Sequence, residues 1–432
     1  MTTLLAPSET GLLASWTAHH RADLAAHLQS HGPPPVPTRA DRAGTARLVA
    51  ELRASGLTGR GGAAFPSAVK LAAVGAGRRG ATIVVNAMEG EPASDKDRVL
   101  LTVVPHLVVD GAQVLARLLG ARRVVLCVAD DRDHTAARVT AALAERAAAG
   151  IDPVHVELAR PPARYVSGEE SALVSWLDGG AGAPRFRRDK AVPLTLCRRP
   201  ALVHNAETLA HVALIARHGA AWFRSRGNED APGTTLVTVS GAVEHPAVHE
   251  VPLGMPVADV VALARPNAPV QAALVGGYGG AWLGPRDLAT PCAPGPLARV
   301  GAGVGAGVLV VLGEHECGVA ATAAIAGFMA GESAGQCGPC VFGLPALADD
   351  LDALADGRGS TVTLERLWAR LALVEGRGAC RHPDGVVRMA RSALAVFAPD
   401  VAAHAAGRAC RHDPTASRRH PSPSARSGGR TA

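Results

Sequence analysis

Three cysteines toward the C-terminal end of the chain have the spacing of metal or cluster ligands. Cys337 and Cys340 form a Cys-x-x-Cys pair set among glycines and a proline, and Cys380 supplies a third thiol further along. Thiolates held two residues apart on a tight turn suit zinc or the iron of an iron–sulfur cluster. A disulfide redox pair is the competing interpretation. The spacing therefore predicts a metal or redox centre and leaves its kind open.

Acidic side chains gather at two places where a predicted element begins or ends. Glu89 and Glu91 follow a predicted buried strand at 81–85, and Glu169 and Glu170 follow a Ser-Gly pair at a predicted helix start. Ligand sites in α/β proteins form beyond the carboxyl ends of strands, so these acids are candidates for a site. The plainer interpretation makes the first pair solvated turn residues and lets the second pair stabilise the helix dipole.

A glycine-rich loop precedes a predicted helix at 67–74. The loop reads Gly-Arg-Gly-Gly-Ala-Ala-Phe-Pro over 59–66. Glycines that open a helix let main-chain N–H groups approach an anion, so the loop is a candidate phosphate cradle. A plain turn in a glycine-rich protein explains it equally well. The Rossmann fingerprint is not matched, because no strand leads directly into the loop and no acidic residue stands at the expected place.

The segments that must position these residues alternate between strands and helices. β-Branched apolar runs predict strands, and longer stretches between them predict helices. This alternation is typical of a parallel sheet with helices packed on it. The expected strands are 81–85, 122–129 and 154–158, and the expected helices are 107–119 and 133–149.

Two further modules are expected downstream. The segments 235–243 and 248–252 alternate like a hairpin, and a helix at 257–264 and a strand at 272–275 complete a β-grasp pattern. The pattern then becomes helical, which indicates a bundle around the cysteines. The Ser-, Pro- and Arg-rich end beyond about residue 400 is expected to be disordered. The expected helices of the bundle are 316–330, 341–355, 362–374 and 384–397.

Composition argues against several classes of protein. Lys and Arg number 44 against 38 Asp and Glu, and most of the net charge of +6 lies in the basic tail, so no nucleic-acid partner is expected. Eight scattered cysteines do not form a disulfide framework, which favours a reducing, cytoplasmic location. We expect no signal peptide. The longest apolar run, 300–313, is too short to span a bilayer, so no direct membrane insertion is expected.

Several motifs in one order resemble the flavin subunit of respiratory complex I. Proteins of this NADH:quinone oxidoreductase family bind FMN and oxidise NADH, and they also occur in NAD-reducing hydrogenases and formate dehydrogenases. The resemblance covers roughly residues 50–400, and this chain looks like a divergent member. Each motif alone is weak, but their order and spacing together are specific. The motifs are 59–66, 86–92, 168–173, 205–208, 332–340 and Cys380.

The resemblance implies an α/β fold in three main parts. A Rossmann-like FMN-binding domain would come first, then a β-grasp (soluble-ligand-binding) domain, then a C-terminal helical bundle that carries an iron–sulfur site. The expected boundaries are 1–50 for an N-terminal helical arm, 51–222 for the FMN and nucleotide domain, 234–312 for the β-grasp domain, 314–400 for the iron–sulfur domain and 401–432 for the disordered tail.

The resemblance also implies roles for individual residues. The glycine-rich loop would lie on FMN, Lys70 would help with its charge, and Phe65 would lie beside the bound nucleotide. FMN would accept a hydride and release electrons singly to a cluster. The implied catalytic residues, which face the pyridine nucleotide, are Glu91, Glu169 and Glu170. The implied cofactor-binding residues are Gly59, Arg60, Gly61, Gly62, Ala63, Phe65, Lys70, Asn86, Glu89, Glu91, Glu170, His204 and Asn205, and the implied metal ligands are Cys337, Cys340 and Cys380.

The cysteine stretch departs from the family pattern. The family holds its cluster with Cys-x-x-Cys-x-x-Cys and one distant cysteine, whereas the first position here is Ala334. A 4Fe–4S cluster with one non-cysteine ligand, a 3Fe–4S cluster, or loss of the cluster are the three alternatives. His382, Glu332 and Cys317 are the nearest spare donors in the sequence.

The nucleotide side departs as well. Two aromatics of the family fall at Ala73 and Lys190, and the family's nearby lysine falls at Arg187. The added positive charge suggests NADPH as an alternative to NADH, with ordinary surface charge as the plain account. Met88 replaces a family Asp and His204 a family Asn, so two polar contacts to FMN are in question.

The leading hypothesis is a flavin and iron–sulfur oxidoreductase that resembles NADH dehydrogenase. It would pass electrons between NAD(P)H and a protein carrier, such as a ferredoxin-like protein or another redox subunit. It would be cytoplasmic, either free or peripheral on a membrane complex. One alternative is an electron-transfer flavoprotein without nucleotide oxidation, and another is a non-catalytic, zinc-stabilised assembly protein.

Overall fold

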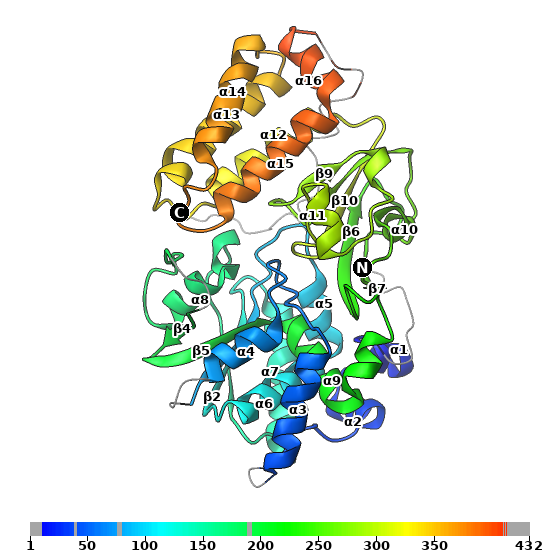
Figure 1. Ribbon diagram of the computed structural model, residues 1–432, viewed down its shortest axis with the longest axis vertical. Coiled ribbons are helices and arrows are strands. Elements are labelled where there is room, and N and C mark those ends of the chain that lie inside the picture. Colours follow the sequence, from blue (N-terminus) through cyan, green and yellow to red (C-terminus); the bar gives the residue numbers. More distant parts are fainter. Residues whose placement is uncertain are drawn as a thin grey trace.

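The computed structural model describes residues 11–38, 41–75, 80–187, 192–408, 410 and 412. Two five-stranded sheets and a group of helices make up the described chain, so the protein is mixed α/β, as predicted. Figure 1 shows the first sheet and its helices at the bottom, the second sheet in the middle, and the helical group at the top.

The first sheet has the strand order β3-β2-β1-β5-β4. β1, β2, β3 and β5 run parallel, and the edge strand β4 runs antiparallel to β5. The chain moves outward from β1 through β2 to β3 and then returns to the other side of β1. The order therefore reverses between β1 and β5, which is where open α/β sheets form a ligand crevice. The strands are β1 Thr82–Ala87, β2 Arg123–Val128, β3 Val156–Ala159, β4 Leu194–Leu196 and β5 Arg199–Asn205.

Helices cover both faces of this sheet because alternate residues of its strands are apolar on both sides. Ile83 and Val85 pack in the core with α6 and α9, whereas Val84 packs in a separate core with α8. Leu48 of α3 joins the first of these cores, so α3 crosses the predicted boundary at residue 50. The helices are α1 Ala14–His19, α2 Leu24–His31, α3 Arg42–Ala54, α4 Ser67–Gly75, α5 Lys96–Val103, α6 Pro105–Leu118, α7 Asp133–Ala149, α8 Glu170–Leu177 and α9 Ala206–Arg224, with a 3-10 turn at Tyr165–Gly168.

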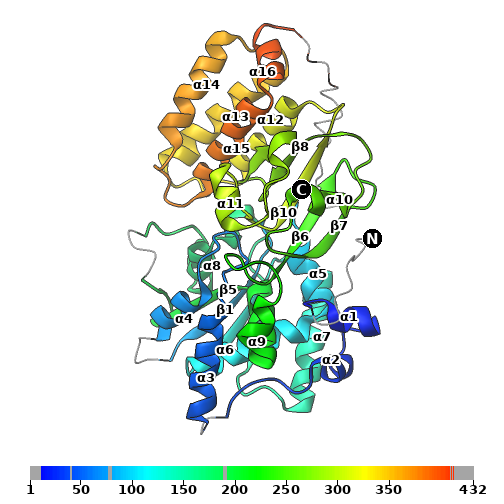
Figure 2. The same ribbon diagram turned by 45° about the vertical axis from the view of Figure 1, so that its right-hand side comes forward.

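The second sheet has the order β7-β6-β10-β8-β9 and is antiparallel except for the β6–β10 pair. Val239 and Val311 face α10 and α11 on one side. Leu274 and Val310 face the helical group on the other side, so this sheet is covered on both faces. Figure 2 shows it between the helical group above and the first sheet below. Its elements are β6 Thr234–Gly241, β7 Ala247–Pro252, α10 Val257–Ala262, β8 Val270–Val275, β9 Ala281–Leu283, a 3-10 turn Pro285–Asp287, α11 Pro294–Arg299 and β10 Val308–Gly313.

The helical group corrects one prediction. A helix at Ala398–Ala405 continues the group, and its Val401 is buried in the common core, so disorder does not begin at residue 401. Proline in the first turn and a following aspartate favour a helix start there. Most of the predicted tail beyond residue 408 lies outside the described residues. The elements are α12 Gly318–Gly331, a π-helical turn Pro339–Gly343, α13 Leu344–Ala355, α14 Thr361–Val374, α15 His382–Val396 and α16 Ala398–Ala405.

Within the described residues, no single helix has both the length and the apolar composition to cross a membrane. Taken together, α5 and α6 are long and apolar enough to span a membrane, but the chain bends by 94° between the two helices.

Candidate functional site

The carboxyl ends of β1 and β5 bring two predicted residues side by side. Asn86 and Asn205 are register partners across the strand pair. The Nδ2 group of Asn205 donates to the carbonyl of Asn86 at 3.2 Å, and the Nδ2 group of Asn86 donates to the carbonyl of Gly168 at 2.9 Å. Asn205 also caps α9, since its Oδ1 accepts from the amide of Glu207. Three segments that are distant in the sequence therefore meet at this crevice.

The glycine loop, residues 59–66, folds against the same crevice. The loop is closed by a hydrogen bond from the Gly59 amide to the Phe65 carbonyl at 2.8 Å. A Cβ atom on Gly61 would lie 3.2 Å from the Cβ of Asn205, so the loop approaches the end of β5 at main-chain distance. Gly62 has a φ of 109°, a backbone conformation that residues with a side chain rarely adopt. The loop therefore packs on the end of β5 too closely for a larger residue at position 61.

The side chain of Arg60 points into the protein. Its guanidinium is buried and donates to the carbonyl of Thr234 at 3.0 Å and to the hydroxyl of Thr58 at 2.8 Å. The carboxylate of Glu207 lies 3.9 Å away. Arg60 therefore fastens the glycine loop to the second sheet through its side chain.

Lys70 and Glu170 form an ion pair at the rim of the crevice. The Nζ of Lys70 contacts a carboxylate oxygen of Glu170 and donates to the carbonyl of Val203 at 2.8 Å. Arg187 donates to the other oxygen of Glu170 at 3.0 Å, so this carboxylate is held between two cations. The buried His204 lies close by, and burial followed by the charge of Lys70 lowers its pKa to about 3. His204 is therefore a neutral imidazole.

Glu91 lies inside the protein, so the interpretation as a solvated turn residue is wrong for it. Its Oε2 accepts from the amide of Tyr278 at 2.9 Å and from the hydroxyl of Tyr165 at 3.4 Å, and its Oε1 accepts from the amide of Ala93. Burial raises the pKa of Glu91 to about 7. This carboxyl group therefore joins the first sheet's loops to the β8–β9 turn and titrates near neutral pH.

Glu89 is half-buried and is also no free turn residue. Its oxygens accept from the amides of Asp97 at 2.7 Å and Arg98 at 3.1 Å and from the hydroxyl of Ser94, which places the carboxylate on the first turn of α5. Burial, then the charge of Asp97, raises the pKa of Glu89 to about 8. The structure uses this side chain to hold α5.

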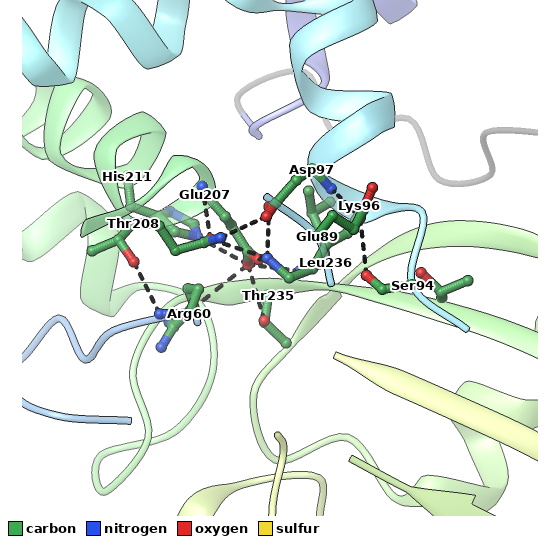
Figure 3. A network of polar contacts seen from close by, with 12 residues as sticks. Arg60, Glu89, Ser94, Lys96, Asp97, Glu207, Thr208, His211, Thr235 and Leu236 are labelled. Carbon is green, nitrogen blue, oxygen red and sulfur yellow. Dashed lines mark hydrogen bonds and ion pairs between the residues drawn. The ribbon is translucent and has the colours of Figure 1, made fainter. Parts of the chain in front are cut away.

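A buried polar network lies beneath the crevice and was missed from the sequence (Figure 3). The Nζ of Lys96 contacts Asp97 at 2.8 Å, Glu207 at 3.0 Å and the Oδ1 of Asn205 at 3.0 Å. Burial opposes this charge, but the two carboxylates outweigh it and raise the pKa of Lys96. Glu207 in turn accepts from Thr235 of β6. The run of charges after Pro92 and the glutamate two residues after Asn205 were the available signals.

Glu169 has the role that the plainer interpretation gave it. Its Oε2 accepts from the amides of Ser171 and Ala172, each at 2.9 Å, and so caps α8. Burial raises the pKa of Cys380, and the charge of Glu169 adds to this shift, whereas the hydrogen bond from the main-chain amide of His382 opposes it. Glu169 therefore lies within electrostatic range of one of the three predicted metal ligands.

The three predicted thiols come together. Cys337 and Cys340 lie on a tight turn in which the Cys337 carbonyl accepts from the amides of Cys340 at 3.0 Å and Val341 at 2.9 Å. Burial, then the neighbouring Cys337 and Cys380, raises the pKa of Cys340 to about 12. The pair and the distant cysteine are thus brought to one place, between the C-terminal end of α12 and the start of α15.

The cysteine loop, residues 331–340, rests directly on the loops of the first sheet. Glu332 accepts from the amide of Tyr165 at 2.8 Å, and Arg164 donates to the carbonyl of Ser333 at 2.9 Å. Gln336 donates to the carbonyl of Pro184 at 2.6 Å. The candidate cluster ligands are therefore neighbours of the Glu169 turn.

The three spare donors differ in their surroundings. One carboxylate oxygen of Glu332 accepts from the amide of Tyr165, and Cys317 lies at the opposite end of α12. The Nε2 of His382 lies 2.8 Å from the carbonyl of Met329, whereas its buried Nδ1 has no hydrogen-bond partner among the described residues. His382 is therefore the spare donor with a free nitrogen atom near Cys380.

Two phenylalanines are exposed beside the crevice. Phe65 of the glycine loop is 41% exposed, and Phe186, which the sequence reasoning overlooked, is 75% exposed. Ala73 is half-buried on α4, and Lys190 lies outside the described residues. An aromatic within the basic stretch was the signal for Phe186.

A cavity of about 180 Å³ borders the glycine loop on its side toward residues 303–307. Its lining includes Gly59, Arg60 and Gly62 but none of Lys70, Asn86, Glu170 or Asn205. The cavity is therefore separate from the group of polar side chains at the strand ends.

Comparisons with known proteins agree with this arrangement. Residues 52–214 match the Nuo51 FMN-binding domain, and residues 320–404 match the NADH-ubiquinone oxidoreductase-F iron-sulfur binding region. Residues 236–265 match the SLBB domain. The F 2 subunit of NADH-quinone oxidoreductase from Rhizobium meliloti (strain 1021) is 30% identical over 377 residues, which cover 84% of this chain and 90% of that relative. The chain belongs to the family of NADH-quinone oxidoreductase F subunits.

Other similar proteins extend the family beyond respiratory enzymes. The HndC subunit of NADP-reducing hydrogenase from Solidesulfovibrio fructosivorans is 27% identical over 379 residues, covering 84% of this chain and 77% of the relative. A crystal structure of NAD+-reducing NiFe-hydrogenase in the H2-reduced state matches with a TM-score of 0.81 and 30% identity, covering 96% of this chain and 68% of that chain. The resemblance inferred from the motifs is confirmed at the level of the family.

Proposed function

We propose that this chain is an oxidoreductase that binds FMN at the carboxyl ends of β1 and β5 and an iron–sulfur cluster at Cys337, Cys340 and Cys380. It oxidises NADH or NADPH at the same crevice and exchanges electrons with a protein partner. When bound, FMN supplies hydride acceptance and single-electron release, which the protein orients and tunes. Membership of the family of NADH-quinone oxidoreductase F subunits supports this proposal.

The residues at the crevice fit FMN. Gly61 lets the glycine loop lie directly against the end of β5, because a Cβ there would lie 3.2 Å from the Cβ of Asn205. Lys70 supplies positive charge, and the amides of Asn86 and Asn205 lie at the strand ends. Gly59, Gly62 and Ala63 would face the cofactor through the main chain. Glu89 and Arg60 would act indirectly, by holding α5 and the glycine loop.

The cysteine group fits an iron–sulfur cluster with three protein thiolates. Cys337, Cys340 and Cys380 lie near one another, and the Nδ1 of His382 has no hydrogen-bond partner among the described residues. A 4Fe–4S cluster ordinarily has four cysteine ligands. The cluster would therefore be either a 4Fe–4S cluster with one non-cysteine ligand or a 3Fe–4S cluster.

The contact between the cysteine loop and the flavin-side loops carries the proposal. Electron transfer requires the two redox sites to be close, and Glu332 and Arg164 join their supporting loops directly. Glu169 caps α8 in the crevice and lies within electrostatic range of Cys380. The same turn thus borders both sites.

The nucleotide would lie on the open side of the crevice. Phe65 and Phe186 offer exposed rings for stacking, and Glu170 is held in place by Lys70 and Arg187. Glu91 places a carboxyl group near neutral pKa inside the site, where a negative charge favours the positive nicotinamide left after hydride departure. The basic side chains fit either NADH or NADPH, and the relative HndC is named as NADP-reducing.

The remaining parts fit a component of a larger assembly. We assign the first sheet as a Rossmann-like FMN domain, the second sheet as a β-grasp domain and α12–α16 as the iron–sulfur bundle. The domain boundaries at 51–222, 234–312 and 314–400 stay predictions. The electron acceptor would be another redox subunit or a ferredoxin-like carrier.

Anaerobic purification of the full chain tests the proposal. We expect about one FMN per chain, visible flavin absorption that bleaches with NADH or NADPH, and a cluster signal in electron paramagnetic resonance. A signal in the oxidised state that vanishes on reduction identifies a 3Fe–4S cluster. Glu170→Gln should slow bleaching, whereas the exposed control Glu157→Gln on β3 should not. A colourless protein, or flavin that neither nucleotide reduces, would contradict the proposal.

A further inference from the structure

A second group of soft metal ligands lies at the N-terminal end of α12, away from the predicted cluster ligands. Cys317 directly precedes α12, His404 lies on α16, and Cys410 follows α16. One ligand atom of each residue lies within 4.8 Å of the others. Residues that are 87 positions apart in the sequence, Cys317 and His404, thus come together. The helix that carries His404, α16, is at the top of the helical group in Figure 1.

The three side chains are arranged as a built site. The Sγ of Cys317 lies 3.4 Å from the Nε2 of His404, and both residues are buried. The amide of Ala320 points at the same sulfur from 3.4 Å, which favours a thiolate at this helix start. Cys410, which follows α16, is half-buried and is the third member of the group.

The chemistry of this set matches zinc. Two cysteine sulfurs and one imidazole nitrogen are ligands that Zn2+ prefers in tetrahedral sites, and three protein ligands leave one position open. The Nε2 of His404 already faces the Sγ of Cys317 at 3.4 Å, so both atoms can reach one ion.

His412 is close to the group but is already engaged. Its Nε2 lies 3.2 Å from a carboxylate oxygen of Asp400 and 3.1 Å from the amide nitrogen of Gln271. Asp400 belongs to α16, and Gln271 belongs to β8. These contacts place His412, two residues beyond Cys410, against both the bundle and the second sheet.

The group is separate from the proposed cluster site. Cys317 lies before the first residue of α12, and Cys337 follows its last residue. A 14-residue helix is about 21 Å long at 1.5 Å per residue, so the two thiol groups lie at opposite ends of that length. No single cluster can use both groups.

We propose that Cys317, His404 and Cys410 bind one zinc ion that fastens the chain just after α16 to the start of α12. Binding displaces the protons of the two thiols, and the fourth position is taken by water. The ion ties α12, α16 and the segment after α16 together and so contributes to folding free energy. The site takes no part in the oxidation of nicotinamide.

Metal analysis of the full chain, purified without oxygen from zinc-containing medium, tests the proposal. We expect about one zinc per chain in addition to iron. Cys410→Ser and His404→Gln should each lower the zinc content severalfold and leave the iron content unchanged. Cys340→Ser should lower the iron content and leave the zinc content unchanged. Cys292→Ser is the matched control, because Cys292 is buried in the core of the second sheet and belongs to neither group.

Cobalt replacement gives a readout that does not depend on activity. The wild-type chain with Co2+ should show sulfur-to-cobalt charge-transfer absorption, and Cys410→Ser should weaken it, with Cys292→Ser unchanged. Equal zinc in the wild-type chain and in Cys410→Ser overturns the proposal. So does a Cys317–Cys410 disulfide found by mass spectrometry in the anaerobically purified chain. Cys410→Ser lies at the half-buried edge of the group, so it should fold where Cys317→Ser fails.

Discussion

The two ends of α12 carry thiol groups of different character. At the C-terminal end, Cys337, Cys340 and Cys380 lie on turns that rest against the loops of the first sheet. At the N-terminal end, Cys317 lies deep in the bundle beside His404. The first group borders a crevice where exposed aromatic rings and carboxyl groups gather. The second lies in the core that the bundle shares with the second sheet.

On our two proposals, the difference separates a site for electron transfer from a site for stability. A redox centre must lie near its donor, so its ligands are placed on turns that contact the flavin-side loops. A structural ion gains from burial and from joining distant segments, since metal binding then favours the folded chain. Cysteine would then serve two purposes at the two ends of one helix.

The largest expected effect is from Cys340→Ser. Removing one of three thiolates should abolish the cluster and slow electron transfer from NADH or NADPH to a one-electron acceptor by more than about 100-fold, because even residues that only support a ligand cost about 10–100-fold. Flavin content and zinc content should stay unchanged. Stopped-flow reduction and metal analysis measure these quantities. Full activity in Cys340→Ser would remove the functional distinction between the two ends of α12.

Glu91→Gln should remove the pH dependence of flavin reduction. With a pKa of about 7, Glu91 ionises as the pH rises through neutrality, and its charge then favours the positive nicotinamide. Flavin reduction in the wild-type chain should therefore rise with pH across this range. Glu91→Gln should be flat and about tenfold slower at pH 8, since a nearby charge contributes on the order of 1 kcal/mol or more.

The same carboxyl group should make the stability of the folded chain fall as the pH rises, whereas it makes flavin reduction faster. Because its pKa is higher in the folded chain than in the unfolded chain, folding favours the protonated form, and stability falls as the pH rises from about 4.5 to about 7. Thermal unfolding of the wild-type chain and of Glu91→Gln across this range measures the contribution. An unchanged pH profile of both rate and melting in Glu91→Gln would contradict this role.

Glu332→Ala should loosen the cysteine loop. Its carboxylate accepts from the amide of Tyr165, and a hydrogen bond to a charged group contributes about 1.5–3 kcal/mol. We expect slower electron transfer to the acceptor with little change in flavin reduction, because only the contact between the two sites is weakened. The control is Glu314→Ala at an exposed position. Equal rates in the two variants would show that this contact does not position the cluster.

The smallest effect should come from two glycines of α12. A Cβ on Gly318 would lie 2.4 Å from the ring of Phe397, so Gly318→Ala should lower the free energy of unfolding by about 1–3 kcal/mol. Gly331 has open space around it, so Gly331→Ala should be neutral or raise stability by up to about 1 kcal/mol through helix propensity. Chemical denaturation of both variants tests whether α12 is packed more tightly at its N-terminal end, at Gly318, than at its C-terminal end, at Gly331.

The sequence predicted the strands and helices of this chain well because apolar runs and alternation are local signals. Most of the expected strands and helices are present, with shifts of a few residues at their ends. The error beyond residue 400 arose because composition was weighed above local helix signals. Ala398, Pro399 and Asp400 form a good first helical turn that precedes the basic stretch.

The site could be predicted only in part. Strand ends marked Asn86, Glu89 and Glu91, but their convergence with Asn205 depends on which strands pair, and the sequence analysis predicted no strand order. Lys96 and Glu207 were missed because a buried charge network is defined by contacts between distant segments. Cys317, His404 and Cys410 gave no signal, since their spacing follows no recognised motif.

The contacts that place the cysteine loop have a consequence for assembly. Each of them pairs a side chain on one segment with a main-chain group on the other: Glu332 with the amide of Tyr165, Arg164 with the carbonyl of Ser333, and Gln336 with the carbonyl of Pro184. None involves a sulfur atom. The polypeptide can therefore form the receptacle for its inorganic centre before any iron arrives. Cluster insertion would then act on a loop that the polypeptide already positions.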